Sequence, residues 1–252
     1  MLTTPTLEKL RSLRLLGMAH SLEEQLASGD CNDLSFEERL GLMVDRETTE
    51  RSNSRFKTRL TQARIRHQGA CLEDIDYRAP RGLDKTLMKS LGNCEWIKNH
   101  HNLLITGPTG AGKSFLACAL AHRACLEGYR VLYVRVSRLF QDLVLGRGDG
   151  RYPRIMQSVT KPQLLILDDF GLAALTDANR SDLLEILEDR HGVVSTVVTS
   201  QFPVASWHEL IGNPTLADAI LDRLVHDAHK ITLKGESMRK KNSKLTESQT
   251  ED

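Results

Sequence analysis

The chain lacks the features that mark secreted and membrane proteins. It has five cysteines, but no two of them form a C-x-x-C pair, and we expect buried, reduced thiols rather than disulfides. No apolar run reaches the roughly 18 residues that a membrane-spanning helix needs, and the first residues show no charged-then-apolar signal pattern. These absences predict a cytoplasmic protein that has no membrane partner.

An excess of charge of one sign is also missing. The 252 residues carry a formal net charge of +1, so a contact with nucleic acid has to be argued from local segments. With 40% hydrophobic and 27% charged residues, the composition is that of an ordinary globular protein. The length allows one good-sized α/β domain and a smaller appended one.

A glycine-rich turn between an apolar run and a helix-forming run is the strongest motif. Residues 103–105 are apolar, residues 107–114 read G-P-T-G-A-G-K-S, and residues 115–121 favour a helix. The pattern G-x-x-x-x-G-K-S in this strand–loop–helix context predicts a P-loop, which binds nucleotide phosphates. The residues assigned to nucleotide binding are Gly107, Pro108, Thr109, Gly110, Ala111, Gly112, Lys113, Ser114 and Phe115.

Each residue type in this motif has a chemical reason. Glycines allow successive backbone N–H groups to point at phosphate oxygens, beside the positive end of the following helix. Lys113 supplies a mobile charge for the β- and γ-phosphates, and Ser114 offers a hydroxyl group to Mg²⁺. The sequence therefore predicts a nucleotide site that also uses Mg²⁺.

The second motif is an apolar strand, residues 164–167, that ends in Asp168 and Asp169. In a parallel sheet such side chains lie at the carboxyl edge, where open α/β folds bind their ligands. Asp168 suits the Walker B role of holding Mg²⁺, and Asp169 is placed to orient or deprotonate an attacking water. The adjacent acid favours hydrolysis over phosphate transfer to a small molecule.

The remaining patterns are mainly helical. Residues 5–27 predict one helix, or two broken near Gly17, and a second helix begins at Ser35, where Glu38 completes a capping box, and extends as far as His67. Further predicted elements are a strand at 131–134, a helix at 138–145, a flexible basic loop at 146–154, a helix at 177–190, a strand at 193–199 and a helical segment at 214–229.

One helical segment has a local excess of positive charge. Residues 46–66 contain seven basic residues against two glutamates, and Arg51, Arg55 and Arg59 fall on one face of a helix. Such a face is either a solvated helix surface or a contact for DNA phosphates. The sequence leaves both interpretations open.

Six stretches together resemble the IstB family of transposition helper ATPases, which are AAA+ proteins close to the DnaC-type helicase loaders. Two of them, the P-loop at 107–114 and the stretch with the aspartate pair at 164–171, are shared by many ATPases, and a third stretch is V-T-S-Q at 198–201. The family-specific ones are L-R-L-L-G-M-A at 13–19, N-P-T-L-A-D-A-I-L-D-R-L at 213–224 and G-E-S-M-R at 235–239. They span nearly the whole chain.

The resemblance implies an α/β fold of the AAA+ P-loop NTPase type, with a parallel five-stranded sheet between helices and a small all-helical N-terminal domain before it. It implies ATP and Mg²⁺ as cofactors and ATP hydrolysis. It also implies assembly on double-stranded DNA as an oligomer or filament, and a partner transposase. By position, Gln201 matches the sensor-1 polar residue, Arg223 the arginine finger and Arg239 the sensor-2 arginine, whereas residues 137–160 occupy the place of a helical insertion that can face DNA.

We expect a helical N-terminal domain at 1–70, an ATPase domain at 71–241 and a disordered tail at 242–252. Two other functions stay open. A helicase loader would share the ATPase residues but bind a replicative helicase through its N-terminal helices. In a small-molecule P-loop kinase, Arg223 and Arg239 would instead bind phosphates within one subunit.

Overall fold

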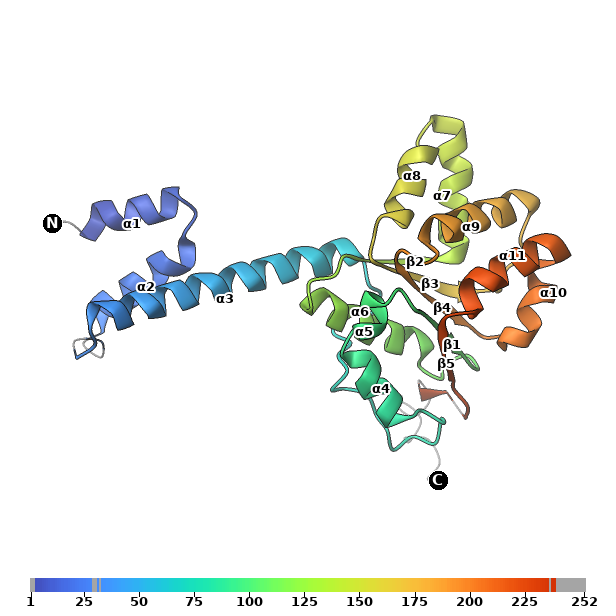
Figure 1. Ribbon diagram of the computed structural model, residues 1–252, viewed down its shortest axis with the longest axis horizontal. Coiled ribbons are helices and arrows are strands. Elements are labelled where there is room, and N and C mark those ends of the chain that lie inside the picture. The colour runs from blue at the N-terminus through green and yellow to red at the C-terminus, as the bar shows by residue number, and fades with distance from the viewer. Residues whose placement is uncertain (1–2, 29–30, 32, 236, 239–252) are drawn as a thin grey trace, which may run out of the picture. The chain divides into compact units, whose positions relative to one another are not determined.

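The computed structural model describes residues 3–28, 31, 33–235 and 237–238, which form two compact units, Met1–Thr58 and Arg59–Asp252 (Figure 1). The division falls within helix α3 (Phe36–Ala63), whereas the sequence places the domain boundary near residue 70, which remains a prediction. Within the described ranges, no helix combines the length and the apolar character needed to cross a membrane. The predicted tail at 242–252 lies outside the described residues.

The first unit contains α1 (Thr3–Ser12), α2 (Leu16–Ala27) and most of α3. The N-terminal helical pattern is therefore two helices broken near Gly17, and the break itself lies at Arg14, which has a left-handed φ of 59°. Gly17 lies inside α2, where a Cβ atom would stand 2.6 Å from the Cα of Glu47 in α3. This glycine thus allows the two helices to approach closely.

The predicted capping box at the start of α3 is confirmed. The amide of Ser35 donates to the Glu38 carboxylate (2.8 Å), and the amide of Glu38 donates to Ser35 Oγ (3.3 Å). The predicted end of this helix at His67 is wrong, because α3 ends at Ala63. Arg64 adopts a left-handed φ of 53°, and a residue in that conformation stops a right-handed helix.

The second unit is built on the predicted five-stranded parallel sheet, with strand order β2-β3-β4-β1-β5. Because β4 lies between β1 and β3, the carboxyl ends of these three strands adjoin. That edge therefore collects the P-loop, which follows β1, and the aspartates, which end β3. The strands are β1 (Asn102–Thr106), β2 (Val131–Arg135), β3 (Leu164–Phe170), β4 (Ser195–Ser200) and β5 (Ala228–Thr232).

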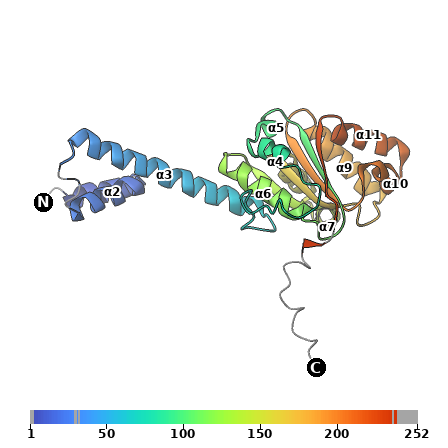
Figure 2. The same ribbon diagram turned by 90° about the horizontal axis from the view of Figure 1, so that it is seen from below.

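Helices cover both faces of the sheet, with α6 on one face and α9 on the other (Figure 2). Leu104, Leu165 and Val198 pack into the same core as the helices that follow β2, while neighbouring strand residues turn to the α6 side. The helices of this unit are α4 (Lys85–Gly92), α5 (Glu95–Lys98), α6 (Lys113–Leu126), α7 (Val136–Asp149), α8 (Tyr152–Thr160), α9 (Asp177–Arg190), η2 (Val204–Ser206), α10 (Trp207–Ile211) and α11 (Pro214–Val225).

The basic segment 146–154, predicted as a flexible loop, is mostly helical. Helix α7 continues to Asp149 and α8 begins at Tyr152, so only a tight turn at Gly150, with φ of 79°, separates them. Arg147 donates two hydrogen bonds to the buried carboxylate of Asp182 in α9, and Tyr152 donates to the same carboxylate (2.8 Å). The prediction of a flexible loop is therefore wrong, because the buried carboxylate of Asp182 holds α7 and α8 together as a helical hairpin.

Two other boundaries also differ from the sequence prediction. Strand β4 begins at Ser195 rather than Val193, because the amides of Val193 and Val194 both donate to the carbonyl of Arg190 in a turn (3.1 Å each). The predicted helical segment at 214–229 ends at Val225, and Ala228–Thr232 forms strand β5 along β1.

Arg190, the last residue of α9, is 1% exposed. Its side chain joins the segment that leads into β3 to the start of β4. All three guanidinium nitrogens donate, to Thr196 Oγ1 and to the carbonyls of Val159, Pro162 and Ser195 among others. Burial lowers the pKa of Arg190 to about 9. This arginine is a structural cation with every donor nitrogen engaged.

Candidate nucleotide-binding site

The P-loop connects β1 to α6 along a path that requires glycine. Gly107 has a φ of 143°, and a Cβ atom there would lie 2.5 Å from the carbonyl oxygen of Leu233. Gly112 has a φ of 96° and immediately precedes α6, whose first turn no described side chain caps. The first amides of α6 are therefore available to an anion.

Lys113 begins α6 and is only 6% exposed, because its side chain folds back over the loop. Its Nζ donates to the carbonyls of Gly107 (2.7 Å) and Pro108 (2.9 Å). These bonds hold the cation against the loop that the sequence assigns to the phosphates.

Asp168 is fully buried at the end of β3, and three hydroxyl groups hold its carboxylate. Ser114 Oγ donates to Oδ1 at 2.8 Å, Thr199 Oγ1 also donates to Oδ1, and the Tyr133 hydroxyl donates to Oδ2. A buried carboxylate is tolerated only with such partners. Burial, followed by the bond to Asp168, raises the pKa of Tyr133, which keeps that hydroxyl protonated as a donor.

The oxygen atoms of Ser114 and Asp168 fit Mg²⁺. This ion prefers hard oxygen ligands and is usually bound by one or two carboxylates together with substrate phosphates and water. In the part of the chain that the structure describes, no cluster of three or more His, Cys, Asp or Glu residues forms another metal site.

Asp169, the next-to-last residue of β3, has an unusual backbone conformation. Its φ is 64°, the pairing of β3 with β4 shifts register between Leu167 and Phe170, and its amide donates to Thr199 Oγ1 (3.1 Å). Burial and the neighbouring Asp168 raise the pKa of Asp169, although Arg135, Arg66 and Lys113 oppose the shift. A strained residue with a raised pKa is typical of a reacting group.

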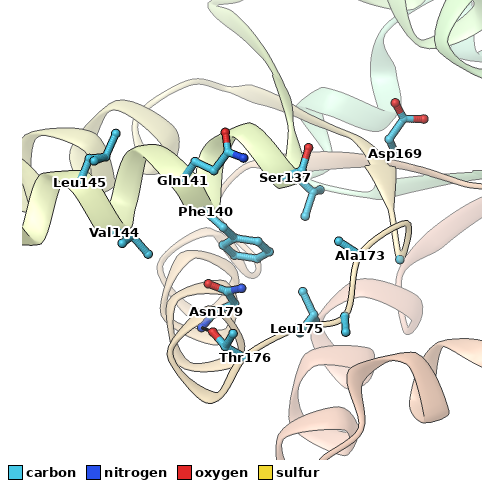
Figure 3. A pocket seen from close by; sticks show the side chains of 13 residues that line it. Ser137, Phe140, Gln141, Val144, Leu145, Asp169, Ala173, Leu175, Thr176 and Asn179 are labelled. Carbon is cyan, nitrogen blue, oxygen red and sulfur yellow. Dashed lines mark hydrogen bonds between the residues drawn. The ribbon is translucent and has the colours of Figure 1, made fainter.

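An apolar pocket of about 500 Å³ adjoins this aspartate, between α7 and the segment that joins β3 to α9 (Figure 3). Phe140, Val144 and Leu175 are among the residues that line it, and Asp169 stands at its rim with the carboxylate directed away from these side chains.

Gln201, predicted as a sensor, lies beside the P-loop. Thr109 Oγ1 donates to Gln201 Oε1 at 2.7 Å. Strand β4 thus delivers Thr199 to the aspartates and Gln201 to the loop, so one strand end touches both motifs.

The two arginines predicted as site residues, Arg223 and Arg239, are not among the described residues that meet at the P-loop. Arg223 lies in α11, where its guanidinium donates to Glu188 (2.9 Å) and to the carbonyl of Ala219 (2.9 Å). The side-chain amide of Asn102, at the start of β1, donates to the carbonyl of Arg223 (2.9 Å), which places Arg223 at the edge of the sheet opposite the P-loop. Arg239 lies outside the described residues.

Two residues near the site carry no motif in the sequence. Tyr133 belongs to a strand that the sequence predicts correctly. The only feature of the sequence that could have pointed to its role is a hydroxyl-bearing side chain between aliphatic neighbours. Arg81 is 5% exposed, and its guanidinium donates to the carbonyl of Ala111 in the P-loop (3.2 Å). Both contacts join segments far apart in the chain.

The predicted basic face of α3 is partly occupied by internal bonds. Arg51 pairs with the buried carboxylate of Glu47 (2.5 Å), and Arg59 donates to the carbonyl of Cys125 in α6 (2.8 Å). Arg55 is exposed and has no hydrogen bond or ion pair with any residue in the described ranges. Of the three, Arg55 is therefore the one available to an external phosphate.

Comparison with known proteins agrees with the site. The family model described as "IstB-like ATP binding protein" matches residues 8–246. An insertion sequence ATP-binding protein of Sinorhizobium fredii is 55% identical over 240 residues, covering 95% of this chain and 98% of that protein.

The fold is also found among solved structures. A DnaC helicase loader matches with a TM-score of 0.56 and 18% identity, covering 67% of this chain and 99% of that one. DnaI matches with a TM-score of 0.56 and 23% identity, covering 66% and 91%. These neighbours confirm the predicted AAA+ P-loop fold.

If Asp169 accepts a proton from the attacking water, ATP hydrolysis should slow on acidification at a pH above the pKa of about 3.9 of an ordinary aspartate. The ionised carboxylate is the active form, and burial and Asp168 raise its pKa, so the rate is lost earlier as pH falls. The measurement is kcat for phosphate release across pH, with the folded state checked by circular dichroism.

Asp169→Asn is the matched control, because it keeps the shape of the side chain and leaves Asp168 in place. We expect it to retain ATP binding and to lose turnover about a hundredfold or more. Hydrolysis by this variant at the wild-type rate would show that another group accepts the proton.

Proposed function

Because the chain belongs to the family of IstB-like ATP-binding proteins, we propose that it is an ATP-dependent, DNA-binding regulator of transposition. In this proposal it assembles on target DNA in the cytoplasm, hydrolyses ATP, and recruits or stimulates a partner transposase. The relative from Sinorhizobium fredii is named as an insertion sequence ATP-binding protein, which supports a role in transposition.

The hydrolytic part rests on the meeting of the P-loop, the aspartate pair and Gln201 at one edge of the sheet. Lys113 and the first amides of α6 would bind and orient the phosphates. Asp169 would take the proton of the attacking water, and Gln201, already bonded to the loop, would orient the γ-phosphate or the water.

Ser114 and Asp168 would hold Mg²⁺, which neutralises charge on the phosphates when bound. The chain itself keeps these two oxygen donors together, because Ser114 donates directly to Asp168. The hydroxyl groups of Thr199 and Tyr133 donate the remaining hydrogen bonds to this carboxylate.

The two other functions are less well supported. The likeness to helicase loaders lies in the fold, whereas the family match covers the N-terminal residues from residue 8 onward as well. For a small-molecule kinase, Arg223 would have to reach phosphates within one subunit. Its place at the opposite edge of the sheet argues against that role.

The first test is phosphate release from ATP with and without duplex DNA. We expect hydrolysis in the absence of any small-molecule acceptor and a several-fold increase when DNA gathers protomers. Lys113→Ala, which removes the mobile cation of the P-loop, should lose nucleotide binding and serves as the blank. Phosphate release that requires an added acceptor would favour the kinase.

Arg223 is suited to serve a neighbouring protomer. Strand β1 separates it from the P-loop of its own chain by the strand's length, about 13 Å at the usual rise per residue. The Arg223 side chain is one-quarter exposed, and its guanidinium forms an ion pair with Glu188 (2.9 Å). An arginine finger supplied by another subunit contributes about 10³ to 10⁵ in rate.

Mixing two inactive variants tests this role. Arg223→Ala keeps an intact P-loop without a finger, and Lys113→Ala keeps a finger without a working P-loop. Mixed on DNA, they should recover part of the activity, and the specific activity of the wild type should rise with protein concentration.

Glu188→Ala is the control, because it removes the ion pair of Arg223 but leaves the guanidinium. It should remain active if Arg223 is a finger, and should match Arg223→Ala if only the ion pair matters. No recovery in the mixture, with activity unchanged on dilution, would refute the shared site.

DNA binding through α3 is the remaining part of the proposal. Arg51 and Arg59 serve internal contacts, and a glutamate at position 51 would face the buried carboxylate of Glu47. Replacing all three arginines would therefore disturb the fold together with any DNA contact. A substitution of Arg55 alone tests the DNA contact without breaking these internal bonds.

Arg55→Gln should weaken binding to duplex DNA without regard to sequence, because a phosphate contact carries no base information. The slope of log affinity against log salt should fall by about 0.9 for one lost phosphate contact. Arg55→Lys, which keeps the charge, should retain the slope. An unchanged slope in Arg55→Gln would identify a solvated surface.

A further inference from the structure

Arg81 places a buried guanidinium against the P-loop. Its Nη1 donates to the carbonyl of Ala111 (3.2 Å) and its Nη2 to the carbonyl of Asp76 (3.0 Å). A Cβ atom on Gly112 would lie 2.6 Å from Nη1, so the absence of a side chain at that position also makes room for this cation. Arg81 thus ties the segment before α4 to the loop.

This guanidinium differs from that of Arg190. Arg190 engages all its nitrogens, whereas the buried Nε of Arg81 has no hydrogen-bond partner among the described residues, and no carboxylate there forms an ion pair with Arg81. Burial lowers the pKa of Arg81, yet an arginine remains charged in proteins. The charge of Asp76 opposes this lowering, but burial dominates. Burying a cation that lacks an ion pair within the described residues is costly, so the position of Arg81 needs a reason.

The peptide group between Ala111 and Gly112 gives a reason for the buried position of Arg81. In a trans peptide the carbonyl and the following N–H point in opposite directions. A donor that holds the Ala111 carbonyl therefore directs the Gly112 N–H to the other side of the loop, where a phosphate would accept it.

We propose that Arg81 is a positioning residue of the nucleotide site, which fixes the Ala111–Gly112 peptide with its N–H group toward the nucleotide phosphates. The inference rests on the proposed binding of ATP at this P-loop. The role requires the forked guanidinium, because one lysine nitrogen cannot take the two separate carbonyl positions that Nη1 and Nη2 occupy.

The test is the affinity for MgADP, measured by isothermal titration calorimetry on the full chain, with Arg81→Lys, Arg81→Met and the control Arg190→Lys. Thermal unfolding without nucleotide identifies the folded variants and sets a temperature well below every midpoint. Both Arg81 variants should bind MgADP about ten- to a hundredfold more weakly. Arg190→Lys should lower the unfolding midpoint but keep the affinity within about twofold.

Two results would overturn the inference. Wild-type affinity in Arg81→Lys would mean that charge alone matters, and wild-type affinity in Arg81→Met would mean that the residue is only structural. Arg81→Lys carries the test alone if Arg81→Met does not fold. Failure of the wild-type protein to bind MgADP would instead refute the proposed function.

Discussion

The buried carboxylate of Asp168 constrains the whole catalytic edge. A buried carboxylate requires hydrogen-bond donors. The three hydroxyl groups that donate to Asp168 come from α6, β2 and β4. Those elements must therefore meet around the end of β3. The strand order provides this meeting, since β3 has β2 and β4 as its neighbours and α6 follows the strand beyond β4.

The nucleotide loop is likewise held from outside. Gly107 packs against Leu233, the amide of Met238 donates to the carbonyl of Gly110 (2.9 Å), and Arg81 holds Ala111. Segments from the beginning and the end of the second unit thus contact the same short loop. A loop supported in this way has less freedom to lose when a ligand binds.

The predictable features are those whose cause is local. The P-loop, the aspartate pair and the capping box of Ser35 are each defined within a few residues, whereas the five-stranded sheet is implied by the resemblance to the IstB family. The features that sequence reasoning misses depend on distant partners. Asp182 orders the turn at Gly150, and Arg81 reaches a loop 30 residues further on. No periodicity encodes such contacts, because they are decided only when the chain has folded.

Arg223 stands at the opposite edge of the sheet from the P-loop, and this separation has a geometric consequence for any row of protomers built on it. If each guanidinium completes the next site, an open row has one P-loop without a finger at one terminus and one finger without a P-loop at the other. A closed ring has neither. An open row would therefore be chemically polar, retaining ATP at one terminus while every interior site turns over.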